Sequence, residues 1–232
     1  MLRPSIYPNL IGQAAMLEDR AFITMKHDDN PWAEGLIFTV LIGIAVAIAG
    51  FIGGLLMSAS LPPANAVLDL FLSALRQQPQ EVANLSVLEA MLRQFWEGYK
   101  FISGYDSGWQ RLLLLVWTPL GLVMQWLFSG FLVHVVAKAV GGKGSFNQTL
   151  GATALMAAPA LLRVLSVVPF VQVSTLLLAV WSTLILFRAV EVVHELPWRK
   201  AAITSTVPLI VVLLLLGVIE TVAIALISGG GV

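Results

Sequence analysis

The chain has 232 residues, of which 58% are hydrophobic and only 11% are charged, and its mean hydropathy is +0.89. An ordinary soluble domain carries about 25% charged residues, so this composition excludes a soluble globular protein. Thirteen Lys and Arg balance thirteen Asp and Glu, and cysteine is absent. The charge balance argues against a nucleic-acid partner, and the lack of cysteine excludes disulfides and thiolate metal sites.

Residues 1–35 are mixed and polar, with Leu10, Ala14, Leu17 and Ala21 at helical spacing. This pattern predicts a cytoplasmic amphipathic segment ahead of the membrane region. The segment lacks a short apolar core with a small-residue cleavage site, so we expect no cleaved signal peptide.

Four apolar blocks are long enough to cross a membrane, since about 20 helical residues span ~30 Å of hydrocarbon. They are residues 36–57, 112–137, 150–187 and 201–227. The third block is nearly twice the required length, and Pro169 near its middle predicts a turn there. We therefore predict an all-α integral membrane protein with five transmembrane helices. Residues 36–60 form the first, 61–111 an amphipathic helical insert, and 112–232 the other four.

The distribution of Lys and Arg predicts the orientation, because cytoplasmic loops retain an excess of positive charge. With the N-terminus inside, the inner segments hold eight basic residues and the outer segments hold four. We therefore expect a multi-pass protein of the cell (inner) membrane with a cytoplasmic N-terminus.

The insert contains an amphipathic helix, because apolar residues recur at steps of three and four opposite Glu89, Arg93 and Glu97. We expect opposite-charge pairs between neighbours along that polar face. A shorter helix precedes it at residues 67–75. The pair can lie in the membrane interface, cap the bundle or bind a partner helix. The interface residues are Leu88, Leu92, Phe95, Trp96 and Tyr99.

Small residues in the first transmembrane helix predict close helix packing, since backbones approach each other where side chains are small. Gly43 and Ala47, and Gly50 and Gly54, are four residues apart. They fit packing within one bundle or the seam of a homodimer.

Two charges fall inside predicted transmembrane helices, where a charge near the centre costs roughly 2.5 to 3.5 kcal/mol. Arg163 and Glu220 are expected at similar depth in the outer half of the membrane. We predict that they form an intramembrane charge pair or share a water-filled pocket. The alternative for Arg163 is that its long side chain reaches the interface alone.

A second polar group is predicted at the cytoplasmic ends of the second and fourth transmembrane helices. It contains His134, Glu191, His194 and Glu195. The last three share a helical face if the fourth helix continues that far, and imidazoles with carboxylates can bind a transition metal. The alternative is a set of charge-balanced residues next to the membrane.

Catalytic motifs are incomplete. His194-Glu195 begins like a zinc-protease helix, but the second histidine is missing and Pro197 interrupts the pattern. The sequence 141–145, GGKGS, lacks the Ser or Thr that follows the lysine of a phosphate loop, so a tight glycine turn is the better interpretation. We expect neither an enzyme nor a cofactor.

From residue 138 onward the order of features resembles the Yip1-domain family. The similar positions are 141–150, the Ala157-Ala158-Pro159 sequence, Pro169, Trp181 and 188–194, with Pro31-Trp32 upstream. The resemblance implies five transmembrane helices and a cytosolic N-terminus, and it places His134, Glu191 and His194 at polar positions typical of prokaryotic members. The insert 61–111 departs from the family pattern.

Eukaryotic members are associated with Rab GTPases, vesicle budding and the shape of the Golgi and endoplasmic reticulum, whereas prokaryotic relatives have no settled role. The short N-terminal segment here resembles prokaryotic members, so a Rab function is not transferred. We expect a non-enzymatic scaffold that organises the lipid bilayer, a membrane-protein partner or a homodimer. The alternatives are a small metal-ion or proton transporter or channel, and an accessory subunit of a larger membrane complex.

Overall fold

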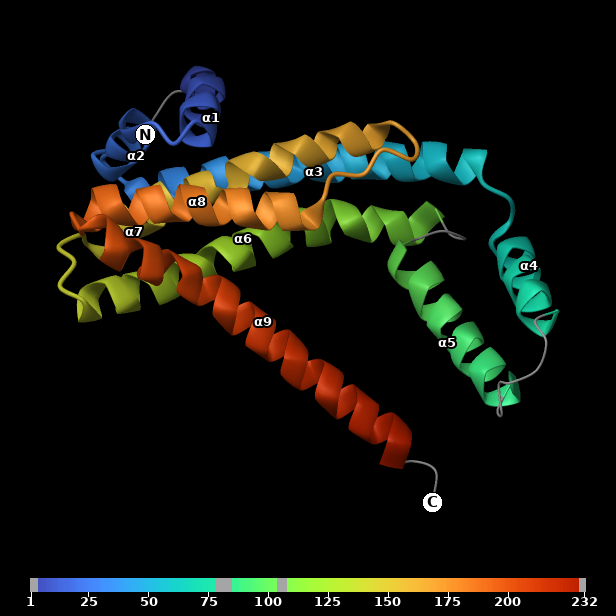
Figure 1. Cartoon of the computed structure of the whole chain (residues 1–232). Coiled ribbons are helices and arrows are strands. Elements are labelled where there is room, and N and C mark those ends of the chain that lie inside the picture. The colour runs from blue at the N-terminus through green and yellow to red at the C-terminus, as the bar shows by residue number, and fades with distance from the viewer. Residues whose placement is uncertain (1–3, 78–84, 104–107, 230–232) are drawn as a thin grey trace. The chain divides into compact units, whose positions relative to one another are not determined.

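A computed structural model describes residues 4–77, 85–103 and 108–229, and every regular element in these ranges is helical (Figure 1). In chain order the elements are η1 (Pro4–Ile6), α1 (Tyr7–Ala15), α2 (Asp19–Lys26), α3 (Pro31–Ser60), α4 (Ala64–Arg76), α5 (Leu85–Ser103), α6 (Gly108–Ala139), α7 (Phe146–Thr153), η2 (Ala154–Val167), α8 (Thr175–His194) and α9 (Trp198–Gly229).

Five helical stretches in the described part of the chain are long and apolar enough to cross a membrane, which confirms the predicted number. They are Pro31–Ser60, Arg111–Ala139, Phe146–Val167, Thr175–His194 and Trp198–Val222. The first helix begins at Pro31, five residues before the predicted boundary. Residues 78–84 and 104–107 of the insert lie outside the described ranges.

The described residues form two compact units. Unit 1 lies within Met1–Gly43, Leu120–Leu161 and Ser174–Val232, and unit 2 lies within Ile44–Pro119 and Leu162–Val173. Unit 1 therefore holds α1, α2, the first part of α3, the last part of α6, α7, the first part of η2, α8 and α9. Unit 2 holds α4, α5 and the turn after η2.

The third apolar block folds back where the sequence predicts, at Pro169. Helix η2 ends at Val167, α8 begins at Thr175, and Phe170 in the turn has a left-handed backbone with φ +66°. In unit 1 the two arms are in contact, since Ser182 Oγ in α8 donates to the Met156 carbonyl oxygen at 2.9 Å.

The third transmembrane stretch combines an α-helix with a 3-10 helix. It begins as α-helix in α7 and continues for 14 residues as a 3-10 helix, η2, which contains Pro159. A 3-10 helix rises ~2.0 Å per residue, so the 22 residues of this stretch extend about 40 Å, enough to cross the hydrocarbon. The periodicity of the sequence does not distinguish this winding from an α-helix.

The N-terminal segment packs against the bundle of unit 1. It forms two helices rather than one, separated at Leu17, which has φ +61°. Leu10 and Phe22 are fully buried, and Trp181 Nε1 in α8 donates to the Ala15 carbonyl oxygen at 3.0 Å. These contacts make the segment part of the folded core of unit 1.

Glycines allow backbones to approach closely in both units. In unit 1 a Cβ on Gly151 would lie 2.5 Å from Pro31 Cβ, and in unit 2 a Cβ on Gly53 would lie 1.9 Å from the Ser166 carbonyl oxygen. The four predicted packing residues are placed differently. Gly43 and Ala47 are buried, Gly50 is half-buried with open space at its Cβ position, and a Cβ on Gly54 would lie 3.6 Å from the Arg111 side chain.

Candidate functional site

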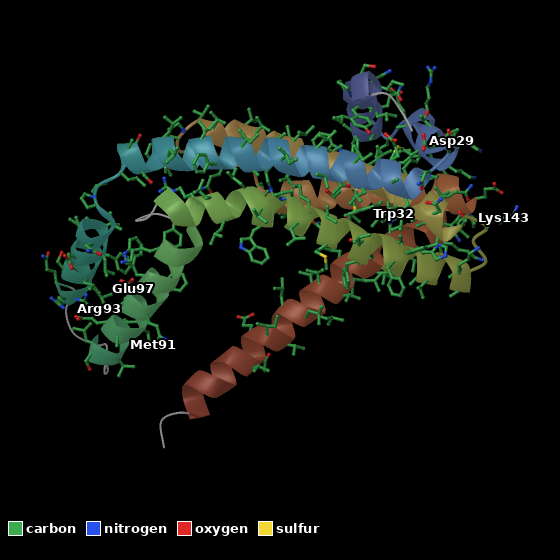
Figure 2. The ribbon with its side chains drawn as sticks, turned by 180° about the vertical axis from the view of Figure 1, so that it is seen from behind. Asp29, Trp32, Met91, Arg93, Glu97 and Lys143 are labelled. Carbon is green, nitrogen blue, oxygen red and sulfur yellow. The ribbon has the colours of Figure 1, made fainter. Side chains whose placement is uncertain are left out.

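Helix ends and loops gather at one end of unit 1, which we call the polar end. The Trp32 N–H at the start of α3 donates to Asn147 Oδ1 in α7 at 2.8 Å, and the Lys143 N–H donates to the His194 carbonyl oxygen at 3.1 Å. Figure 2 shows Asp29, Trp32 and Lys143 at this end. The start of α3, the loop after α6, the start of α7 and the end of α8 therefore meet here.

Two histidines and a threonine contact one another at the polar end, and we call them the His–Thr cluster (His134, Thr149 and His194). Thr149 and His194 are buried, and His134 is half-buried. Thr149 Oγ1 lies 2.9 Å from His134 Nδ1 and 2.9 Å from His194 Nε2. The imidazole centroids are 5.4 Å apart, and the His134 ring meets the edge of Phe146. The cluster joins α6, α7 and α8.

The hydroxyl of Thr149 links the proton positions in the cluster. When it donates its single hydrogen to the Ser145 carbonyl oxygen, 2.8 Å away, both histidine nitrogens that face it donate to it. A neutral His194 then carries its proton on Nε2 and presents Nδ1 as an acceptor. Among the described residues Nδ1 has no hydrogen-bond partner, and His194 is fully buried.

A glycine turn between α6 and α7 covers His194. Gly141 adopts φ +95°, and the Gly142 N–H donates to the Ala137 carbonyl oxygen at 2.7 Å. A Cβ on Gly142 would lie 2.6 Å from His194 Nδ1, and a Cβ on Gly144 would lie 2.5 Å from Val193 Cγ1. The predicted tight turn is confirmed, and its glycines make room for the imidazole.

The two carboxylates of the predicted polar group lie in separate ion pairs. Helix α8 ends at His194, and Glu195 follows in a left-handed conformation with φ +53°, so Glu195 does not continue the helical face. Its carboxylate lies 3.1 Å from Lys143 Nζ and 3.5 Å from Lys26 Nζ. Glu191 instead pairs with Arg188, which also pairs with Asp19.

The pKa of Glu195 is lowered from its ordinary value, first by the hydrogen bond from Lys143 and then by the charges of Lys143 and Lys26. Across residues 4–77, 85–103 and 108–229, no three His, Asp or Glu side chains are grouped as they would be around a metal ion. The structure thus brings the two histidines together without the two carboxylates, and the metal site stays a prediction.

Unit 2 contains a second candidate site, the α4–α5 hairpin. Arg76 in the last turn of α4 pairs with Glu89 near the start of α5 through two contacts of 2.7 Å, and the two helices run in opposite directions (Figure 1). The hydrogen bond from Arg76 lowers the pKa of Glu89. The sequence predicts that Glu89 pairs with a neighbour within α5, whereas in the structure its carboxylate pairs with Arg76 of α4.

The apolar residues of α5 divide into two stripes. Leu88, Leu92 and Trp96 are half-buried, and the interface residues Phe95 and Tyr99 are exposed. At 100° per residue the exposed stripe directly adjoins the half-buried one on the helix. It consists of Val87, Met91, Phe95 and Tyr99, with Phe95 71% exposed. Sequence periodicity alone did not separate these stripes, because they adjoin each other on the helix.

Helix α4 repeats this division. Leu68 and Leu72 are buried, whereas Leu70 and Phe71 are exposed. On both helices the exposed apolar stripe lies beside the buried or half-buried one, and the charged residues lie on a different face. Figure 2 shows Met91 and Arg93 on opposite sides of α5.

The base of the hairpin is held by Arg111. This side chain is 5% exposed and hydrogen-bonds Ser58 Oγ, joining the start of α6 to the end of α3 within unit 2. Arg163 is exposed in η2, and Glu220 is exposed in α9. They belong to different units, so their pairing stays a prediction.

Residues 15–219 match the family model described as the Yip1 domain. No curated protein and no solved structure matches the chain.

Proposed function

The chain belongs to the Yip1 domain family of integral membrane proteins, and from that premise we propose that it is a non-enzymatic protein that organises the surrounding bilayer or its membrane-protein partners. One observation carries this proposal. The α4–α5 hairpin, which lies outside the five transmembrane stretches, has an exposed apolar stripe on each helix, and we infer that the two stripes form one apolar side.

The position of the hairpin along the chain supports the proposal that lipid covers its apolar side. Three residues separate the end of α3 at Ser60 from the start of α4 at Ala64, and three extended residues reach at most about 11 Å. Both α3 and α6 cross the membrane, so the hairpin is tethered to the interface at both ends. In unit 2, α4 and α5 run across the direction of α3 and α6 (Figure 1), as helices lying in the membrane plane would.

The charges of the hairpin support apolar attachment rather than attraction to anionic lipid. Helices α4 and α5 carry three acidic residues and three basic residues, which are Asp69, Glu89, Glu97, Arg76, Arg93 and Lys100. Interfacial helices that depend on anionic lipid are rich in Lys and Arg. We therefore expect the hairpin to insert equally into neutral and anionic membranes.

Depth measurements on the full chain test the placement of the hairpin. The chain has no cysteine, so a single introduced cysteine can carry an environment-sensitive fluorophore without background. In vesicles of neutral phospholipid, the label on Met91→Cys should emit at shorter wavelength and be quenched by spin-labelled lipid. The matched label on Arg93→Cys should be quenched by aqueous iodide. Equal quenching at the two positions would contradict insertion of the apolar side.

The organising function needs a separate measurement. A hairpin inserted in one leaflet expands that leaflet, so reconstituted vesicles should become smaller as the ratio of protein to lipid increases. The variant Phe95→Ser with Leu70→Ser should abolish the change in diameter measured by electron microscopy. The control Arg93→Ser, among the charged residues of α5 and on the side opposite Met91 (Figure 2), should retain it. A size change that survives in the double variant would refute the assignment to the hairpin.

A buried apolar segment favours this function over transport. Residues 154–160 of η2 are all buried and consist of alanine, leucine, methionine and proline. They follow the His–Thr cluster directly along the third transmembrane stretch, where a hydrophilic pathway would need polar lining. Ion flux into liposomes that decreases in His134→Ala and Glu191→Ala would instead favour the transporter. A stoichiometric partner retained in mild detergent would favour the accessory subunit.

We also propose that the N-terminus is cytoplasmic, because this orientation places eight basic residues inside and four outside. Single cysteines at Met16, which is exposed before α2, and at Gln94 in the hairpin provide the test. A membrane-impermeant maleimide should label Gln94→Cys in intact cells and label Met16→Cys only after permeabilisation. The reverse pattern would overturn the orientation.

A further inference from the structure

Arg163 lines an open pocket of about 320 Å³ in unit 2. The arginine lies in η2, four residues before its end at Val167, and within the third transmembrane stretch. At ~2.0 Å per residue, its backbone is about 8 Å below the end of that helix. The other lining residues are Val46, Gly50, Thr118, Ser166, Val171, Gln172 and Val173.

The chemistry of this pocket suits an anion. Arg163 is the one charged residue among the eight that line it, and Thr118, Ser166 and Gln172 add two hydroxyls and an amide. These groups come from η2, α6 and the turn before α8, so the fold brings them together from three segments. Helix α3 contributes Val46 and Gly50, and Gly50 leaves open space at its Cβ position. The pocket therefore combines a cation, neutral donors and room for a ligand.

An arginine at this depth is costly unless its charge is balanced. The guanidinium group has five N–H donors in a planar arrangement that matches phosphate, and hydrogen bonds between charged partners are about twice as strong as neutral ones. Phosphate is also the anionic group that phospholipids supply at the membrane interface. The backbone contact of Gly53 with Ser166 holds η2 against α3 and so maintains the pocket.

We propose that this pocket binds a phosphate group, with Arg163 as the charged ligand and Thr118, Ser166 and Gln172 as supporting hydrogen-bond partners. A phospholipid headgroup and free phosphate supply the same chemistry. The site is separate from the exposed side of the hairpin and does not depend on the function proposed for it.

Binding to the detergent-solubilised full chain tests the proposal. The probes are short-chain phosphatidylcholine, short-chain diacylglycerol, which lacks the phosphate, and inorganic phosphate. Short-chain phosphatidylcholine should bind and raise the unfolding temperature, and diacylglycerol should not. Arg163→Gln should weaken binding about tenfold or more, with partial rescue in Arg163→Lys. The control Arg199→Gln, at the start of α9 in unit 1, should bind as the parent does.

Two further variants keep the test informative if Arg163→Gln does not fold. Thr118→Val and Gln172→Ala retain the arginine and should each weaken binding by a smaller factor. Binding of inorganic phosphate that depends on Arg163, without a preference for the lipid, would identify free phosphate as the source. Equal binding of phosphatidylcholine and diacylglycerol, or unchanged binding in Arg163→Gln, would overturn the proposal. Binding that arises only in Glu220→Gln would also overturn it, because Glu220 would then neutralise Arg163 in the parent.

Discussion

The hydroxyl of Thr149 lies 2.9 Å from Nε2 of the fully buried His194, and this contact joins the first turns of α7 to the last turn of α8. The two residues are 45 positions apart in the sequence. Their contact fixes the point at which the third and fourth transmembrane helices meet at the polar end.

Thr149→Val should destabilise the protein, because valine has the same shape but leaves the facing nitrogens of His134 and His194 without an acceptor. A buried polar group without a partner costs about 1 to 3 kcal/mol. Thermal unfolding in detergent, followed by tryptophan fluorescence, measures the change. The control Thr206→Val removes an exposed hydroxyl that bonds only within α9 and should have little effect. Equal losses in the two variants would argue against a structural role for the cluster.

Gly53→Ala should destabilise the packing of η2 on α3, because the new methyl group would lie 1.9 Å from the Ser166 carbonyl oxygen. Overpacking of this kind costs about 1 to 3 kcal/mol. Gly121→Ala in α6 is the matched control, since its Cβ position has nothing within 4 Å and alanine favours a helix by roughly 0.5 to 1 kcal/mol. In unfolding by increasing SDS, Gly53→Ala should be less stable than the parent and Gly121→Ala slightly more stable. Equal stabilities of the two variants would contradict the close contact between Gly53 and Ser166.

Glu195 should contribute to stability in a manner that depends on pH. Its pKa is lowered in the folded state by Lys143 and Lys26, so its contribution is present above the ordinary carboxyl pKa of about 4.3 and is lost as the pH falls through the lower folded value. The unfolding temperature of the parent should exceed that of Glu195→Gln at pH 7. The two curves should converge toward pH 3 and in high salt, which screens exposed charges. A difference that persists in acid would refute the electrostatic origin.

Tyr7→Phe should loosen the N-terminal helices from unit 1. Tyr7 donates a 2.5 Å hydrogen bond to Glu34, which is 1% exposed in the first turn of α3, and burial followed by Glu34 raises the pKa of Tyr7. Loss of this donor should cost about 1 to 3 kcal/mol. Trypsin should cleave after Arg20 or Lys26 faster in the variant than in the parent. Unchanged cleavage would show that the apolar contacts of α1 and α2 suffice.

At the polar end, the sequence predicted some of the residues that come together but not all of them. It identified His134 and His194 as polar residues at the ends of the second and fourth transmembrane helices, and the structure places their rings 5.4 Å apart. It did not identify Thr149, because a threonine near the start of a helix has many possible partners. It placed Glu195 on the helical face only if the fourth helix continued that far, and α8 ends one residue earlier.

In the hairpin, too, the sequence predicted the pattern within one helix but not the contact between the two helices. Periodicity identified α5 as amphipathic, because side-chain direction within a helix follows from its 3.6-residue repeat. It assigned Glu89 to a partner on the same helix, although Glu89 pairs with Arg76 of α4. Periodicity likewise merged the half-buried stripe containing Leu92 with the exposed stripe containing Phe95.

The five membrane-spanning helices, the break at Pro169, the amphipathic insert and the family were all predictable from the order of the amino acids alone. Each follows from the length, composition or order of residues along one segment, and the membrane imposes these requirements on every helix separately. Only the tertiary structure decided that Thr149 joins two histidines, that Arg76 bridges the hairpin, and that Arg163 shares a pocket with Thr118 and Gln172. These relationships depend on how separate helices are rotated and packed against one another, and the local pattern of one helix does not contain that information.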